Sequence, residues 1–202
     1  MASASGAPIG TDRGRAKADR QAALLRASAR LFAERGFAGV SLEDLGTAVG
    51  ISGPAVYRHF SSKQALLGTI LVSVSDRLLS GGREVVAQHD DALVQLEALV
   101  AFHADFAVTD ADVIRVQDRD LASLSDEDRH RVRRLQREYV GVWIGVLAQL
   151  RPTTDAELRV RAHACFGLLN STPYSVRGLR SPPGETAVRG ILGKMALAAL
   201  TQ

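Results

Sequence analysis

Apolar residues recur along most of the chain at spacings of three and four, which is the period of an α-helix with one buried face. No segment alternates apolar and polar residues over the length of a strand, so the pattern predicts an all-α protein. Beyond residue 62 the pattern predicts a series of helices, whose expected ranges are 63–80, 84–108, 111–122, 126–150, 154–177 and 184–200.

Boundary signals separate these helices. The pair Gly81-Gly82 predicts the first break, because glycine is a poor helix former. The segment 181–184, which contains two prolines, predicts the last one. Residues that can accept a hydrogen bond from a free helix N–H precede the third, fourth and fifth helices, and these expected caps are Asp110, Ser125 and Thr154.

Two shorter helices are predicted before residue 62. Ser41 is a good N-cap for the first of them, and Asp44 places a carboxylate where it suits a helix N-terminus. Leu42, Leu45 and Val49 share one apolar face, so this helix is expected over residues 42–49.

A tight turn and a second short helix follow. Gly50 can end the first helix in a left-handed conformation, which glycine adopts without a Cβ clash. Ser52 can cap the second helix, and Pro54 fits its first turn because no N–H is needed there. Val56 and Phe60, four residues apart, give this helix a buried face. Two short helices with a brief connection are typical of a DNA-binding helix-turn-helix.

The outward face of the second helix combines small residues at its start with hydrogen-bond donors further along. Small residues allow close approach to a DNA groove, where Pro54 and Ala55 can meet only thymine methyl groups. Arg58 can make a forked contact to guanine or to phosphate, and Lys63 offers a further donor to phosphate. An ordinary exposed helix, with its aromatic side chains packed on the core, is the alternative interpretation.

A set of residues between positions 20 and 67 carries a family resemblance. It consists of the run ARLFAERGF (29–37), Ser41, the run VGIS (49–52), Tyr57, His59, Phe60, Ser62, Lys63 and Leu66. On these residues the segment resembles the N-terminal domain of the TetR family of transcriptional regulators. The resemblance implies phosphate contacts from Ser41, Tyr57, His59 and Lys63. It also implies a groove-facing surface formed by Ser52, Gly53, Pro54, Ala55 and Arg58.

Positive charge is concentrated in the predicted DNA-binding part. Residues 1–63 contain nine Lys or Arg and five Asp or Glu, a net +4, whereas residues 64–202 contain sixteen and seventeen, a net −1. This asymmetry is expected of a domain that binds the phosphate backbone. The predicted organisation is a disordered tail (1–12), a three-helix DNA-binding domain (13–67) and a second helical domain (68–202). Arg13, Arg15 and Lys17 form either a basic arm that enters a minor groove or a solubilising tail.

The resemblance implies that residues 68–202 bind an effector and form a homodimer. In the family the last two long helices pair with those of a second copy as a four-helix bundle, and the two-fold symmetry matches a palindromic operator. Small or apolar residues at helical spacing predict this seam, and they are Ala162, Cys165, Phe166, Leu169, Leu192, Met195, Ala196 and Ala199. Packing in the core of a single chain is the alternative for the same residues.

A ligand pocket is expected between the middle helices. Its candidate lining residues are Phe102, His103, Phe106, Arg115, Gln117, Tyr139, Trp143, Asn170 and Ser171. His103 can instead be a hydrogen-bonded histidine of the core. The charged residues of the helix 111–122 can instead form a solvated face. The polar run 170–173 can line the pocket or kink its helix. A large, mainly apolar cavity would favour a hydrophobic or amphipathic effector, with an acyl thioester as a hypothesis.

The predicted function is that of a ligand-responsive repressor, which an effector releases from its operator by a population shift. The competing interpretations are a small-molecule-binding enzyme and a helical adaptor that binds protein. We find no zincin motif, P-loop, dinucleotide fingerprint or nucleophile elbow, so no catalytic residue, cofactor or metal site is predicted. Neither an apolar run of membrane length nor a signal peptide is apparent, which predicts a cytoplasmic protein. Cys165, a lone cysteine on an apolar helix face, is expected to be inert core rather than a redox sensor.

Overall fold

The computed structural model describes residues 12–51, 53–176 and 179–202, which form helices joined by turns, with no strand among them. The predicted all-α class is confirmed. In chain order the elements are α1 (Asp12–Arg35), α2 (Leu42–Ala48), α3 (Gly53–Tyr57), α4 (Lys63–Ala87), α5 (Ala92–Thr109), α6 (Ala111–Asp120), the 3-10 helix η1 (Leu121–Ser123), α7 (Asp126–Leu150), α8 (Asp155–Leu169), α9 (Thr172–Ser175) and α10 (Glu185–Thr201).

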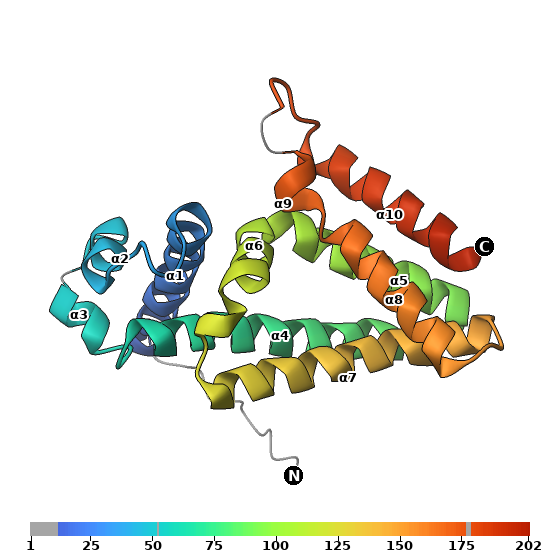
Figure 1. The fold of residues 1–202 in the computed structure, drawn as a ribbon, viewed down its shortest axis with the longest axis horizontal. Helices are drawn as coiled ribbons and strands as arrows, with labels where there is room; N and C mark the ends of the chain where they lie inside the picture. Colours follow the sequence, from blue (N-terminus) through green and yellow to red (C-terminus); the bar gives the residue numbers. More distant parts are fainter. Residues whose placement is uncertain (1–11, 52, 177–178) are drawn as a thin grey trace, which may run out of the picture.

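The helices form a smaller and a larger group, which α4 joins (Figure 1). In the smaller group, α1, α2 and α3 lie together at the end where α4 begins. In the larger group, α4 runs beside α7, and α5 packs on both of them. α8 lies against α7, and α10 packs on α5 and α8. α6 stands between the two groups, in contact with α1 on one side and with α4 and α5 on the other.

Local signals in the sequence specify the smaller group. Ser41 Oγ accepts a hydrogen bond from Asp44 N (3.1 Å), and the Asp44 carboxylate accepts one from Ser41 N (2.8 Å), which closes a capping box at the start of α2. Gly50 has a φ of 71°, as the predicted left-handed turn requires. Val56 is fully buried and holds α3 on the core. The helix-turn-helix is therefore confirmed, while its expected cap Ser52 lies outside the described residues.

The predicted break at Gly81-Gly82 is wrong, because α4 continues to residue 87. A Cβ on Gly82 would lie 2.5 Å from Tyr139 Cε2, and a Cβ on Gly81 would overlap the Phe102 ring. The two glycines therefore permit α4 to pack closely on α7 and α5, and they do not end the helix. From the sequence alone, a glycine pair is equally typical of a helix end and of a close contact between helices.

The other helix boundaries follow the capping residues only in part. Ser125 and Thr154 cap α7 and α8 as predicted, each accepting a hydrogen bond from the N–H three residues later (3.1 and 3.3 Å). Asp110 precedes α6 without making a side-chain cap, and its carboxylate pairs instead with Arg77 (2.6 Å). The first break lies at 88–91, where Asp91 caps α5.

The expected helix 154–177 ends early. α8 stops at residue 169, and the one-turn helix α9 follows. Thr172 Oγ1 donates a hydrogen bond to Ala107 O (2.6 Å), which fixes this bend against α5. The polar run 170–173 therefore ends the helix rather than kinking it. The segment 181–184 separates α9 from α10, as predicted.

α5 is long and apolar enough to cross a membrane by length and composition alone, contrary to the expectation that the chain has no such run. In this fold it packs against α4, α7 and α10. Leu96, Leu99 and Val100 are buried there. We therefore assign α5 to the core of the larger helix group.

Replacement of Gly82 with Ala should lower the free energy of unfolding by about 1–3 kcal/mol, because the added methyl group meets the Tyr139 ring. Gly141→Ala is the matched control, since a Cβ there meets nothing within 4 Å and Ala favours a helix by about 1 kcal/mol. Urea unfolding followed by circular dichroism measures both variants. Equal midpoints for Gly82→Ala and the wild-type protein would contradict the close packing of α4 on α7.

Candidate DNA-binding surface and effector cavity

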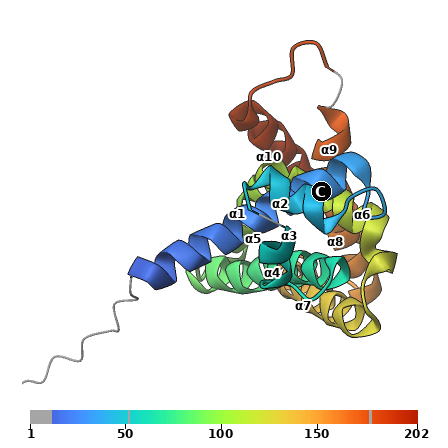
Figure 2. The ribbon, with the colours of Figure 1, turned by 90° about the vertical axis from the view of Figure 1, so that its left-hand side faces the viewer.

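Three hydrogen-bonding side chains are exposed at the end of α3 and in the turn after it, and α3 lies on the side of the molecule that faces the viewer in Figure 2. Tyr57 is 54% exposed, and Arg58 and His59 in the following turn are exposed as well. This grouping fits the predicted contacts to phosphate and base edges. The remaining predicted groove-facing residues in the described chain are Gly53, Pro54 and Ala55, all in α3.

Two predicted phosphate contacts also stabilise the fold. Ser41 is exposed, but its hydroxyl donates to the Asp44 carboxylate (2.8 Å), and hydrogen bonds from the Ser41 backbone and hydroxyl lower the pKa of Asp44. The Lys63 ammonium donates to the carbonyls of Phe37 (2.7 Å) and Val40 (2.8 Å) and lies 4.5 Å from the centre of the Phe37 ring. Lys63 therefore anchors the turn between α1 and α2, which leaves one of its three N–H donors for a phosphate.

The predicted basic arm is helical. Arg13, Arg15 and Lys17 lie in the first turns of α1, and Asp12 already begins this helix. Residues 1–11 of the predicted tail lie outside the described residues. Contact of these cations with a minor groove stays a prediction.

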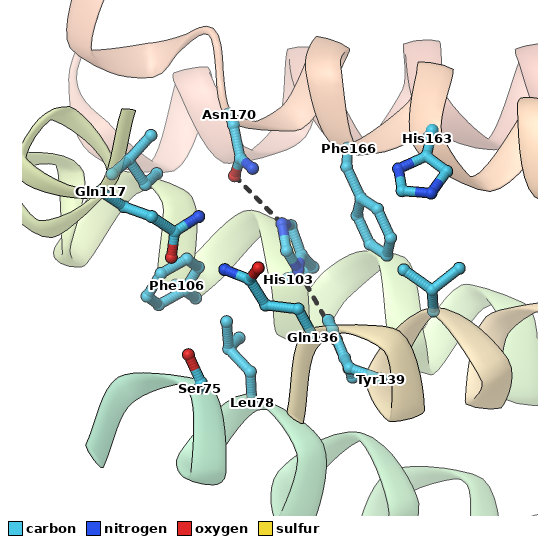
Figure 3. Close-up of a pocket in the computed structure, with 12 residues that line it drawn as sticks. Ser75, Leu78, His103, Phe106, Gln117, Gln136, Tyr139, His163, Phe166 and Asn170 are labelled. Atoms are coloured by element: carbon cyan, nitrogen blue, oxygen red, sulfur yellow. Dashed lines mark hydrogen bonds between the residues drawn. The ribbon is translucent and has the colours of Figure 1, made fainter. Parts of the chain in front are cut away.

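A cavity of about 230 Å³ lies in the larger helix group, enclosed by residues of α4, α5, α6, α7 and α8 and by Asn170 (Figure 3). Its lining residues are Ser75, Leu78, His103, Phe106, Ile114, Gln117, Gln136, Tyr139, Val140, His163, Phe166 and Asn170. Predicted pocket residues among them are His103, Phe106, Gln117, Tyr139 and Asn170. None of the twelve is Asp, Glu, Lys or Arg, and half carry hydroxyl, amide or imidazole groups besides the Tyr139 phenol.

A hydrogen-bonded network crosses the wall of this cavity. His103 is 3% exposed, its Nδ1 lies 3.1 Å from Tyr139 Oη, and its Nε2 lies 3.1 Å from Asn170 Oδ1. Because the amide oxygen of Asn170 only accepts, Nε2 donates and Nδ1 accepts from the Tyr139 hydroxyl. Burial lowers the pKa of His103 to about 4 and raises the pKa of Tyr139. The imidazole is therefore neutral near pH 7, hydrogen-bonded in the core and also part of the cavity lining.

Four predicted pocket residues lie away from the cavity. Phe102 packs on α4, and Trp143 is fully buried behind Phe166, with ring centroids 5.0 Å apart. Arg115 donates a hydrogen bond to a backbone carbonyl of α9 (3.1 Å). Ser171 lies just before α9, where its carbonyl accepts a hydrogen bond from that helix. These four residues are removed from the candidate pocket.

The cavity residues that the sequence did not indicate are Ser75, Leu78, Ile114, Gln136, Val140, His163 and Phe166. Helical periodicity shows which residues share a face, but it does not show which faces of different helices enclose a space. No residue of α4 or α8 was therefore predicted to line the pocket.

Most of the predicted dimer seam is buried within the single chain. The buried members are Ala162, Cys165, Leu169, Leu192 and Ala196. Phe166 lines the cavity. These six side chains therefore contribute to the interior of the single chain, and their part in a dimer seam stays a prediction. Met195 and Ala199 are exposed on α10. Val160 and Ile191, which were not predicted, are exposed apolar residues of α8 and α10.

Cys165 lies in this core. Burial raises the pKa of its thiol to about 12, so the thiol stays protonated and poorly nucleophilic near neutral pH. Across the described ranges, no cluster of three His, Cys, Asp or Glu side chains has the arrangement of a metal site.

Lys63→Met should lower the free energy of unfolding by about 1.5–3 kcal/mol in the absence of DNA, because the carbonyls of Phe37 and Val40 lose a charged donor. The matched control is Arg58→Met, since Arg58 is exposed and its loss should change stability by less than about 0.5 kcal/mol. Urea unfolding of the free protein separates the two variants. If Lys63→Met unfolds at the wild-type midpoint, Lys63 does not anchor the turn.

Comparison with known proteins covers both helix groups. Residues 24–70 match the model for bacterial regulatory proteins of the tetR family, and residues 89–183 match that for a tetracyclin repressor-like C-terminal domain. The chain is 33% identical over 159 residues to the HTH-type transcriptional repressor KstR2 of Rhodococcus jostii, a match that covers 72% of this chain and 74% of that protein. It is 32% identical over 98 residues to the HTH-type transcriptional activator FasR of Mycolicibacterium smegmatis, covering 48% and 45%.

Solved structures share the fold as well. The structure of AibR in complex with isovaleryl coenzyme A and operator DNA superposes with a TM-score of 0.71 at 19% identity, covering 87% of this chain and 97% of that one. At this identity the likeness concerns the fold alone. On the two matched domains and the KstR2 relative, the chain belongs to the TetR family and is a DNA-binding transcriptional regulator.

Proposed function

We propose that this regulator is a repressor whose homodimer binds a palindromic operator and leaves it when a small molecule occupies the cavity. One observation carries the proposal: α6 forms part of the cavity wall through Ile114 and Gln117, and it also packs on α1. A ligand can therefore favour a conformation in which the DNA-binding helices are displaced. An adaptor that binds only protein gives no reason for this link between a cavity and a helix-turn-helix. The proposed repressor would act in the cytoplasm, where operator DNA is.

Repression is supported by the match to the repressor KstR2, which is longer than the match to the activator FasR. The repressor KstR2 matches over 159 residues, whereas the activator FasR matches over 98. In the proposed mode, the bound dimer blocks access of the polymerase to the promoter. Loss of the dimer from DNA then permits transcription.

A homodimer is proposed through the outer faces of α8 and α10. Val160, Ile191 and Met195 are more than half exposed although their side chains are apolar. Ala164 and Gly167, at helical spacing from Val160, are exposed as well and allow a second helix to approach closely. Burial of this apolar surface would stabilise a two-fold dimer, which presents two DNA-binding helix pairs to a palindrome.

The proposed effector presents a small, uncharged group to the cavity. At about 230 Å³ the cavity is smaller than the roughly 300–1,000 Å³ typical of ligand sites, and its lining is more polar than the sequence predicts. The neutral His103 supplies no cation for a carboxylate. A short acyl thioester meets these conditions, with its acyl group enclosed and the rest of the molecule outside. The complex of AibR with isovaleryl coenzyme A supports this choice of probe.

Arg58→Ala should weaken binding to operator DNA by about 1–3 kcal/mol, the contribution of one forked arginine contact to a base. Fluorescence anisotropy on the DNA upstream of the gene, against scrambled DNA and at two salt concentrations, measures this loss. We expect two chains per specific duplex and weaker binding at high salt. Arg83→Ala is the control, because Arg83 pairs with Glu138 in the larger helix group (3.0 Å). Equal binding to specific and scrambled DNA would contradict an operator at this position.

Isovaleryl coenzyme A should change the fluorescence of Trp143, the single tryptophan, because its ring packs against Phe166 and His103 in the cavity wall. Free isovalerate should bind at least about tenfold more weakly, because a carboxylate enclosed without a cation loses about 1–3 kcal/mol. Titration of the fluorescence with each compound measures both affinities. Equal affinity for the acid would contradict an uncharged cavity, and no response to the thioester would exclude this probe as an effector.

A further inference from the structure

Arg119, in the last turn of α6, is held in one orientation by its neighbour. Its Nε lies 3.1 and 3.2 Å from the two carboxylate oxygens of Asp120, and its Nη2 lies 2.9 Å from one of them. The Asp120 side chain is 9% exposed, whereas the Arg119 side chain is 42% exposed, so the pair lies at the surface with its carboxylate turned inward. The planar guanidinium is therefore oriented by the carboxylate beside it.

The fixed guanidinium contacts the carboxyl end of α1. It donates hydrogen bonds to the carbonyls of Phe32 and Ala33, the latter at 3.5 Å. α1 ends at residue 35, and Gly36, with a φ of 81°, turns the chain away. Phe32 O also accepts a backbone hydrogen bond from Gly36 N (2.8 Å), so the guanidinium adds a second donor at this carbonyl. A cation at this end of a helix also interacts favourably with the helix dipole. Arg119 thus serves as a C-terminal cap supplied from a sequence distance of 87 residues.

A second cation holds the other side of the same turn. Lys63, the first residue of α4, donates to the carbonyls of Phe37 and Val40. Val40 is followed directly by Ser41, the cap of α2. The segment 32–40 is therefore fixed between α4 and α6. α6 also packs directly on α1, and the contacts of Arg119 add to this packing at the end of α1 that leads to α2.

We propose that the Arg119–Asp120 pair is a positioning element that sets the angle of the DNA-binding helices and transmits the state of the cavity to them. Gln117 lines the cavity two residues before Arg119 (Figure 3). A shift of α6 that accommodates an effector therefore moves the guanidinium relative to the α1 carbonyls. The inference rests on the proposed function, since it requires a dimer on two half-sites, and it adds the residue pair through which the two sites are coupled.

The angle of the DNA-binding helices determines how far apart the two helix pairs of a dimer lie. The wild-type dimer should therefore prefer one spacing of half-sites. Arg119→Gln keeps a polar amide on a shorter side chain and removes both the positive charge and the forked donor. It should bind a single half-site as the wild-type protein does and lose most of the preference for spacing. A residue with only a structural role would weaken binding to all duplexes alike.

The experiment uses the full-length protein and a duplex that the wild-type protein selects from a random pool. Fluorescence anisotropy gives the affinity for this duplex, for versions with the half-sites one base pair closer or farther apart, and for a single half-site. In Arg119→Gln the spacing preference should fall by about fivefold or more, the lower end of common coupling factors. Arg119→Lys, which keeps the charge without the fork, should retain an intermediate preference. Arg83→Gln, which removes an arginine from an ion pair within the larger helix group, should retain it fully.

Three results would overturn the proposal. A full spacing preference in Arg119→Gln excludes the positioning role and leaves the proposed repressor function standing. No spacing preference in the wild-type protein excludes binding to two half-sites, and the positioning role with it. If circular dichroism shows that Arg119→Gln does not fold, Arg119→Lys provides the test in its place. A spacing preference as strong as that of the wild-type protein in Arg119→Lys would exclude a role for the forked guanidinium.

Discussion

The turn between α1 and α2 depends on two cationic side chains that satisfy its backbone carbonyls from outside. Lys63 reaches the turn from α4, and Arg119 reaches it from α6. Leu42, Leu45 and Val56 hold the short helices α2 and α3 on the core, and this turn sets how they follow from α1. The same contacts that complete the fold of the smaller helix group therefore connect it to the larger one. Fold stability and the geometry presented to DNA are coupled through hydrogen bonds to backbone, which carry no sequence readout themselves.

Glycines in α4 determine how closely the larger helix group packs. Gly81 and Gly82 bring α4 against Phe102 and Tyr139, and a Cβ on Gly68 would overlap the Asp128 carboxylate. Tyr139 is also the hydroxyl donor to the buried histidine of the cavity. Larger residues in α4 would push α7 outward and move this donor. The shape of the cavity thus depends on glycines of α4, although α4 contributes only two of the lining residues.

Local chemistry made the DNA-binding half predictable from sequence, whereas the cavity and the seam depend on long-range packing. Ser41 and Gly50 act on their immediate neighbours, and the structure has both as the sequence predicts. The faces of α8 and α10 are different, because both sides of these helices carry small or apolar residues. Periodicity cannot distinguish Ala162, which is buried, from Val160, which is 68% exposed. The contacts of Arg119 and Lys63 with carbonyls were equally hidden, since any backbone carbonyl is an equivalent partner.

In the proposed effector complex, apolar side chains enclose the ligand and directional hydrogen bonds orient it, because the lining contains no Asp, Glu, Lys or Arg. Both nitrogens of His103 already have partners, and burial keeps the ring neutral, so it orients the wall rather than binding a ligand directly. Within the described chain, the side chains of Gln117 and Gln136 line the cavity without a hydrogen-bond partner of their own. A ligand carbonyl or hydroxyl that pairs with both would bridge α6 and α7. Arg119 follows Gln117 by two residues. In the proposed mechanism, a bridge that fixes α6 against α7 therefore also fixes the guanidinium against the end of α1, and the free energy of ligand binding would act on the DNA-binding helices.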